Sequence, residues 1–455
     1  MATASSEKLY TNPRVLVLSL DAMLVMIGFG IIAPSMAFYL LALEGALSEP
    51  PSPDYVVPDE TTAQFAVTLG LMMAAFMGTR TLLARYWGGV SDIHGRRPMI
   101  LVGLSGYVLL LVLFGIAQNW FQLVLIRALQ GVVSAMVWPV AEASLMDIVG
   151  FERRGEGLGI YNAASNLGFV MGPGLGGVLY NICRDVLLLP VPDVFRVPYF
   201  IGAAIVLPAV LLTALVLPET APRGRIGVPK GPSIESLADD PPQKLEWSRA
   251  MQALYLMAAL NGVAMGLGQP IFQLFLMSRV TTDIGLIGLL ISGAGAVGVA
   301  LTIPAGRLSD RYGRKGIAVW GGACARGSLM VMPLARDLTY VSTIWVLQSA
   351  TISMSQPAMM ALQADIVPWK LRGKLFGTLQ AFFNLGATLG PLVGGFVYSV
   401  FSLVIFGIGP LQIDGVVVPF WLAGGIGLIG TEAVRRYVPE TRGPTRPLVR
   451  ADGSG

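Results

Sequence analysis

Apolar residues in this 455-residue chain gather in long runs that are separated by short polar segments. A helix of about 20 apolar residues crosses a hydrocarbon layer about 30 Å thick. Twelve runs reach this length, so the pattern predicts an all-α integral membrane protein with twelve transmembrane helices. The predicted spans cover residues 14–43, 62–87, 98–117, 120–147, 157–181, 198–217, 248–277, 284–305, 316–335, 339–363, 374–400 and 416–437.

The composition agrees with a membrane environment. Hydrophobic residues make up 54% of the chain and charged residues 13%, whereas ordinary soluble domains carry about 25% charged residues. The first apolar run is far longer than the core of a signal peptide, which has about 7–15 residues, and it lacks a small-residue cleavage site. We therefore interpret the first run as a span.

Lysine and arginine predict the orientation. If both termini lie on one side, Arg184, Arg196, Arg279 and Arg336 are the basic residues of the opposite loops, and nearly all others lie on the side of the termini. Because basic loops stay inside, we expect both termini in the cytoplasm and the chain in the plasma (inner) membrane. The net charge of +4 then reflects topology, and no nucleic-acid partner is expected.

Two pairs of segments recur at an offset of 218 residues. "GGVSDIHGRRP" (88–98) matches "GRLSDRYGRKG" (306–316), and "GIYNAASNLGFVMGPGLGG" (159–177) matches "GTLQAFFNLGATLGPLVGG" (377–395). A register kept over so much of the chain indicates a duplication of a six-span unit. The predicted domains are an N-terminal half at 1–217, a cytoplasmic linker at 218–247, a C-terminal half at 248–437 and a cytoplasmic tail at 438–455.

These motifs carry a family resemblance that covers nearly the whole chain. Two six-span halves, each with G-x-x-x-D-x-x-G-R-[RK] after its second span, resemble the major facilitator superfamily. The pattern G-x8-G-x3-G-P-x2-G-G resembles the fifth-span signature of its antiporters, especially the twelve-span drug:proton branch. "RALQG" (127–131) is similar to that branch's fourth-span arginine motif. The first span is similar to those of tetracycline exporters and vesicular monoamine transporters, which have an acidic residue at the position of Asp21.

The fifth predicted span contains several glycines and a proline, which lower its helix propensity. Gly168, Gly172 and Gly176 lie at i, i+4 and i+8, so another backbone can approach along one strip, and Pro173 bends the helix. Such a strip suits either tight static packing or movement of one half against the other; the resemblance implies a seal between halves and favours movement. The motif residues are Gly159, Gly168, Gly172, Pro173, Gly176 and Gly177, and in the second copy Gly377, Gly386, Gly390, Pro391, Gly394 and Gly395.

The paired loops put fixed charges at the membrane edge. An aspartate there can cap a helix N-terminus, and an arginine can bind a carboxylate bidentately. The resemblance implies that Asp92 faces the start of span eleven and that Arg96 pairs with Asp147, and we expect these residues to form a latch that favours one access state. The predicted latch comprises Gly88, Asp92, Gly95, Arg96, Arg97 and Asp147, with Gly306, Asp310, Gly313, Arg314 and Asp365 in the second half.

Charged residues inside spans are the sharpest functional candidates. An ionised side chain at the bilayer centre costs about 2.5 to 3.5 kcal/mol, so such residues usually face a cavity or a partner. Asp21 and Glu142 are the candidate proton-binding groups, because burial disfavours the charged form of a carboxyl group. Arg127 is expected to be a fixed positive charge near substrate. For Arg80 the alternatives are a pair with Asp21 and a side chain that reaches down from the second span, and Arg326 receives no assigned role.

The substrate cavity is expected to be roomy and weakly polar, because methionines and aromatics with few charges suit varied lipophilic ligands. Its predicted lining is Tyr39, Arg127, Gln130, Trp138, Asn162 and Asn166 in the first half and Gln269, Gln273 and Asn384 in the second.

Other function classes have less support. A convergent nucleophile, base or metal cluster is not evident, and a nucleotide-binding G-x-x-x-x-G-K-[ST] motif does not occur, so neither an enzyme nor a metal or cofactor is expected. We expect a monomer in a lipid bilayer that exports small lipophilic or cationic compounds in exchange for protons by alternating access. A uniporter, facilitator or symporter for a sugar, metabolite or lipid is the alternative, because fold does not fix function.

Overall fold

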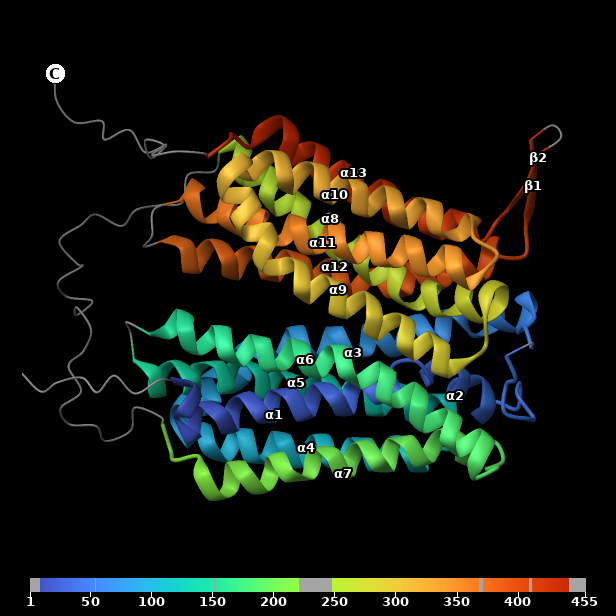
Figure 1. Cartoon of the computed structure of the whole chain (residues 1–455), viewed down its shortest axis with the longest axis horizontal. Helices are drawn as coiled ribbons and strands as arrows, with labels where there is room; N and C mark the ends of the chain where they lie inside the picture. Colours follow the sequence, from blue (N-terminus) through green and yellow to red (C-terminus); the bar gives the residue numbers. More distant parts are fainter. Residues whose placement is uncertain are drawn as a thin grey trace, which may run out of the picture. The chain divides into compact units, whose positions relative to one another are not determined.

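The computed structural model describes residues 9–53, 55–150, 153–220, 248–367, 371–408 and 411–441. Most of the predicted linker and most of the predicted tail lie outside these residues. Long helices dominate (Figure 1). The helices are α1 (Pro13–Ile32), α2 (Met36–Leu43), α3 (Asp59–His94), α4 (Arg96–Ile116), α5 (Trp120–Val149), α6 (Arg154–Asn181), α7 (Asp193–Val216), α8 (Arg249–Phe275), α9 (Ile284–Tyr312), α10 (Arg314–Val331), α11 (Leu338–Ile366), α12 (Arg372–Phe401) and α13 (Val417–Tyr437). Short 3-10 helices, η1 (Leu9–Thr11) and η5 (Met332–Leu334), π-helical turns, η2 (Ile182–Val186) and η4 (Leu276–Val280), and strands β1 (Ile405–Ile408) and β2 (Leu411–Asp414) complete the described elements.

The fold class predicted from the apolar runs is confirmed. Each predicted span corresponds to a helix, except that the first is divided into α1 and α2. Pro34 lies at this break, where a residue without a backbone N–H cannot continue the helical ladder. Within the described residues, ten helices are long and apolar enough to cross a membrane. α6 and α11, with 28 and 29 residues, have comparable length but are not among these ten.

Two compact units make up the chain. Each unit includes the first part of one helix whose remainder belongs to the other unit, and we call these two parts the exchanged helix ends. Unit 1 comprises residues 1–53, 75–237 and 283–292, and unit 2 comprises 54–74, 238–282 and 293–455. The first part of α3 therefore belongs to unit 2, whereas the first part of α9 belongs to unit 1.

In unit 1, the glycine strip of α6 packs directly on α1. A Cβ atom placed on Gly172 would lie 2.6 Å from the Cα atom of Gly30, and Gly168 and Gly176 face backbone atoms of Met23 and Ile31. The neighbour of these three glycines is thus α1, whereas Gly177 of the same motif packs on α9, which belongs to the predicted C-terminal half. Small residues allow this approach because a side chain would fill the space.

The second glycine motif packs in the same way in unit 2. Cβ atoms on Gly390 and Gly394 would lie 2.5 and 2.6 Å from backbone oxygens of Val263 and Leu267 in α8. The last glycine of each motif contacts an exchanged helix end instead: Gly177 faces the start of α9, and Gly395 faces the start of α3. Each motif helix therefore has two close backbone contacts, one with a neighbour helix and one with an exchanged end.

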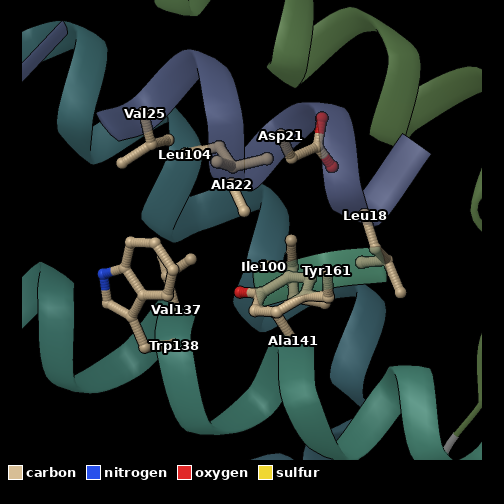
Figure 2. Close-up of a pocket in the computed structure, with 10 residues that line it drawn as sticks. All are labelled: Leu18, Asp21, Ala22, Val25, Ile100, Leu104, Val137, Trp138, Ala141 and Tyr161. Carbon is tan, nitrogen blue, oxygen red and sulfur yellow. The ribbon is translucent and has the colours of Figure 1, made fainter. Parts of the chain in front are cut away.

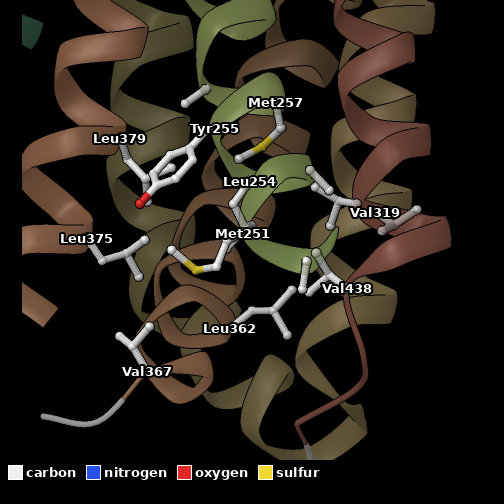
Figure 3. Packing of buried hydrophobic residues seen from close by; sticks show 14 residues of the cluster. Met251, Leu254, Tyr255, Met257, Val319, Leu362, Val367, Leu375, Leu379 and Val438 are labelled. Carbon is white, nitrogen blue, oxygen red and sulfur yellow. The ribbon is translucent and has the colours of Figure 1, made fainter. Parts of the chain in front are cut away.

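Unit 2 has an apolar cluster where α8 and α10 begin and α13 ends. Met251, Leu254, Met257, Val319 and Leu362 are among its buried members (Figure 3). Tight packing of such side chains fixes the helices to one another without polar contacts.

An antiparallel hairpin of β1 and β2 joins α12 to α13, between the last two predicted spans. Arg279 in η4 forms ion pairs with Asp414 at the end of β2 (2.5 Å) and with Asp59 at the start of α3 (2.8 Å). These contacts connect the hairpin to two other elements of unit 2.

Candidate functional site

Asp21 is a buried carboxylate on α1 of unit 1. Its side chain is 4% exposed, and Oδ2 accepts a hydrogen bond from the hydroxyl of Thr213 on α7. Oδ1 is buried and has no hydrogen-bond partner among the described residues. A buried acceptor without a partner is costly, which marks Asp21 as a functional candidate rather than a packing residue.

A small pocket borders Asp21. Helices α1, α4, α5 and α6 supply its lining, and Trp138 and Tyr161 are its aromatic members (Figure 2). Its volume is about 10 Å³, whereas one water molecule needs about 10–15 Å³ on this measure. The pocket is therefore the size of a water or proton site and is much smaller than a site for a drug-sized ligand.

Glu142, the second predicted proton-binding residue, has an exposed side chain on α5. Arg80 on α3 is the basic residue whose charge acts on it. Glu142 is therefore more exposed than Asp21, and the two carboxylates lie in different environments. Arg80 does not pair with Asp21, whose hydrogen-bond partner is Thr213.

Arg127 lies on α5 and contacts a thioether, an amide and an aromatic ring. Its Nε donates to the sulfur of Met36 (3.1 Å), its Nη1 donates to Oε1 of Gln130 (2.9 Å), and its Cζ lies 5.6 Å from the centre of the Phe114 ring. No carboxylate of the described chain forms an ion pair with it. Arg127 thus provides a positive charge that no carboxylate of the described residues neutralises.

The other predicted cavity residues fall into two groups. Tyr39 is 1% exposed, and its hydroxyl donates to the carbonyl oxygens of Phe114 and Ala117, so this side chain packs inside unit 1. Gln130 is buried against Arg127, and the Nε1 of Trp138 donates to Tyr107. The exposed or half-buried candidates are Asn162 and Asn166 on α6 in unit 1, and Gln269, Gln273 and Asn384 in unit 2.

The predicted latch pairs are present in both units. Arg96 Nη1 lies 2.5 Å from Asp147 and Arg96 Nη2 lies 3.7 Å from Asp92, which confirms the pairing that the resemblance implied. In unit 2, Arg314 pairs with Asp365 and Asp310 in the same pattern. Nearby, Arg97 donates to the carbonyl oxygen of Ala214 on α7.

The glycines of the latch have separate roles. Gly95 and Gly313 have φ angles of 104° and 107°, which suit glycine because it has no Cβ, and they form the turns that lead into α4 and α10. Gly88 and Gly306 have open space at their Cβ positions.

Two carboxylates that contact the predicted latch were missed from the sequence. Glu219 accepts a hydrogen bond from the backbone N–H of Arg96 (2.8 Å), and Glu440 accepts one from that of Arg314 (3.0 Å). Each glutamate caps the N-terminus of a helix, where the helix dipole favours negative charge. The signal was available, because the tripeptide Pro-Glu-Thr follows the last span of each half, at 218–220 and 439–441.

Comparison with known proteins agrees with this architecture. The model of the Major Facilitator Superfamily matches residues 18–253 and 254–453. Multidrug resistance protein 1 of Bacillus subtilis (strain 168) is 27% identical over 345 residues, which cover 73% of this chain and 81% of that protein. The class H tetracycline resistance protein of Pasteurella multocida is 24% identical over 425 residues, which cover 91% and 94%. A crystal structure of a bacterial homolog to the human lysosomal transporter Spinster, inward-facing and occupied, aligns with a TM-score of 0.68 at 17% identity, covering 95% of this chain and 96% of that one.

Proposed function

Because the chain belongs to the Major Facilitator Superfamily, a family of transporters for small molecules, we propose that it is a secondary active exporter that exchanges protons for small lipophilic or cationic compounds. The multidrug and tetracycline resistance proteins among its relatives support export of such compounds. The inner membrane is its proposed location, with both termini in the cytoplasm and the protein acting as a monomer.

Asp21 carries the proposal. A carboxylate with one oxygen held by Thr213 and the other unpartnered can take up a proton without a rearrangement of its neighbours. The pocket beside it admits about one water, which can deliver or remove that proton. Protonation removes a buried charge, so it changes the energy of the state in which Asp21 is enclosed.

The other charged groups have supporting roles in this proposal. Glu142 is an exposed proton-binding group on α5 that receives or releases the proton under the influence of Arg80. Arg127 on the same helix holds a fixed positive charge near substrate, and the proton and a cationic compound compete for the carboxylates. The ion pairs of Arg96 and Arg314 act as latches whose opening accompanies the change in access.

The test uses the purified protein in liposomes that are acidic inside and contain a pH-sensitive dye. A panel of lipophilic cations and neutral compounds is added outside, and proton efflux is recorded. We expect efflux that depends on the compound, is abolished in Asp21→Asn and is reduced in Glu142→Gln. Glu60→Gln is the matched control, because Glu60 is an exposed carboxylate at the start of α3.

Uptake of the compound that ignores the pH gradient and survives Asp21→Asn would refute proton exchange. That outcome would favour a facilitator on the same fold, since a facilitator has no need for a buried group that binds protons.

A further inference from the structure

Arg326 places a permanent positive charge in the middle of a span of unit 2. It lies twelve residues after the start of α10, about 18 Å along the helix at 1.5 Å per residue. Its Nη2 donates to Oδ1 of Asn261 (2.8 Å), which lies twelve residues after the start of α8. The side chain therefore reaches across to a neighbouring helix at the same depth.

Glycine on α13 fixes the stem of this arginine. A Cβ on Gly427 would lie 2.5 Å from the Cδ atom of Arg326, so the stem rests on a surface that only glycine leaves free. The contact with Gly427 and the hydrogen bond to Asn261 hold the guanidinium group in one orientation. Donors held in this way can bind a ligand without first losing conformational freedom.

The guanidinium group has N–H donors that form no hydrogen bond with the described residues. Its Nε is buried without an acceptor, and Nη2 to Asn261 is its hydrogen bond to the described residues. No acidic group in the described part of the chain acts on Arg326 electrostatically. A guanidinium group stays charged in proteins, and a charge at this depth is usually paired or lies on a substrate path.

The apolar cluster of unit 2 has members that precede Asn261 on α8 and Arg326 on α10, on the same helix faces. Met257 precedes Asn261 by four residues and Val319 precedes Arg326 by seven, and these spacings repeat one face of a helix. The cluster separates the guanidinium group from the end where α8 and α10 begin. The charge is thus shielded from water on that side, which strengthens its attraction for an anion.

We propose that Arg326 and Asn261 form a binding site for the carboxylate group of a lipophilic compound. Nη1 of Arg326 and the amide nitrogen of Asn261 are donors, and planar guanidinium donors match the two oxygens of a carboxylate. The inference deepens the proposed function, because it adds lipophilic carboxylates to the substrates; it rests on that function for transport but not for binding.

Binding is measured first, in detergent and without a gradient. The probes are fluorescent 1-pyrenebutyrate and its methyl ester, which differ in charge but share the apolar ring. Because a hydrogen bond to a charged group contributes about 10- to 100-fold in affinity, we expect the wild type to bind the carboxylate tighter than the ester by that factor. Arg326→Gln should remove this preference, whereas Arg435→Gln, at an exposed arginine of α13, should keep it. An absent preference in the wild type, or one that survives Arg326→Gln, would overturn the site.

Asn261→Asp separates a binding role from a structural one. The new carboxylate lies beside Arg326 and occupies its donors, so the preference for pyrenebutyrate should disappear while the thermal stability of the protein stays equal or rises. A solely structural arginine predicts the opposite: lower stability in Arg326→Gln and an unchanged preference in Asn261→Asp.

Transport then identifies how the site is used. Pyrenebutyrate that accumulates in liposomes is a substrate, whereas binding without accumulation indicates a retained ligand, and both outcomes support the site. If the carboxylate preference is present but no compound drives proton efflux, the site stands and the proposed antiport fails. If cationic compounds drive proton efflux but no preference is measured, the antiport stands and the site fails.

Discussion

Gly172→Ala adds one methyl group where α6 crosses α1. The new Cβ would lie 2.6 Å from the Cα atom of Gly30 and 2.9 Å from the carbonyl oxygen of Ile27. Carbon atoms in ordinary contact are about 3.5–4.0 Å apart, so the methyl group lacks about 1 Å of space. Both neighbours are backbone atoms and cannot rotate away, which means that the two helices must separate.

The energies can be compared directly. Overpacking costs about 1–3 kcal/mol, and the better helix propensity of alanine returns about 0.8–1.0 kcal/mol. We therefore expect Gly172→Ala to lose up to about 2 kcal/mol of unfolding free energy. Gly159→Ala is the matched control in the same helix, because its Cβ position is open and its residue is exposed. Gly159→Ala should therefore gain only the free energy that the better helix propensity of alanine contributes.

Thermal unfolding of the three purified proteins in one detergent, followed by tryptophan fluorescence, measures the difference. Gly172→Ala should unfold below the wild type and Gly159→Ala at or above it. Gly30→Ala, which adds a methyl group from the other side of the contact, should behave like Gly172→Ala. Equal or higher stability of Gly172→Ala relative to Gly159→Ala would refute the close contact between α6 and α1.

Three further changes have distinct expected results. Thr213→Val removes the hydroxyl that donates to Asp21, and loss of a hydrogen bond to a charged group should lower the rate of proton-coupled transport about tenfold or more. Thr213→Ser keeps a hydroxyl and should retain the wild-type rate; equal rates in the wild type and both variants would contradict this role of Thr213. Glu219→Gln keeps an oxygen acceptor but removes the negative charge at the N-terminus of α4, so it should lower the free energy of unfolding by about 0.3–1 kcal/mol, an effect that an exposed-carboxylate variant should not share. Arg279→Gln leaves its two carboxylate partners without a cation, so hydrogen exchange in the β1–β2 hairpin should accelerate, and unchanged exchange would show that the ion pairs do not hold the hairpin.

Local patterns predicted the helices and the paired charges, because both depend on residues that are close in sequence or recur in the duplication. The ion pair between Arg96 and Asp147 is an example. The partner of the glycine strip could not be predicted, since a smooth face fits any backbone and only the three-dimensional packing selects α1. The hydrogen bond between Asp21 and Thr213 joins residues 192 positions apart. No spacing rule reaches that far.

Arg326 shows what the position of a residue along a predicted span cannot indicate. Its position in the sequence indicated a charge inside a span, but the direction of its side chain depends on the absence of a Cβ at Gly427 on α13. A pattern on one helix does not contain that information.

The exchanged helix ends make each unit depend on residues that are synthesised far from the rest of that unit. Unit 1 includes residues 283–292, so it remains incomplete when the first six spans have left the ribosome. Unit 2 in turn includes residues 54–74, which are synthesised long before the rest of it. A chain cut within the linker would leave each fragment without a helix end that its unit requires. The two fragments should therefore accumulate when they are produced together and be degraded when either is produced alone.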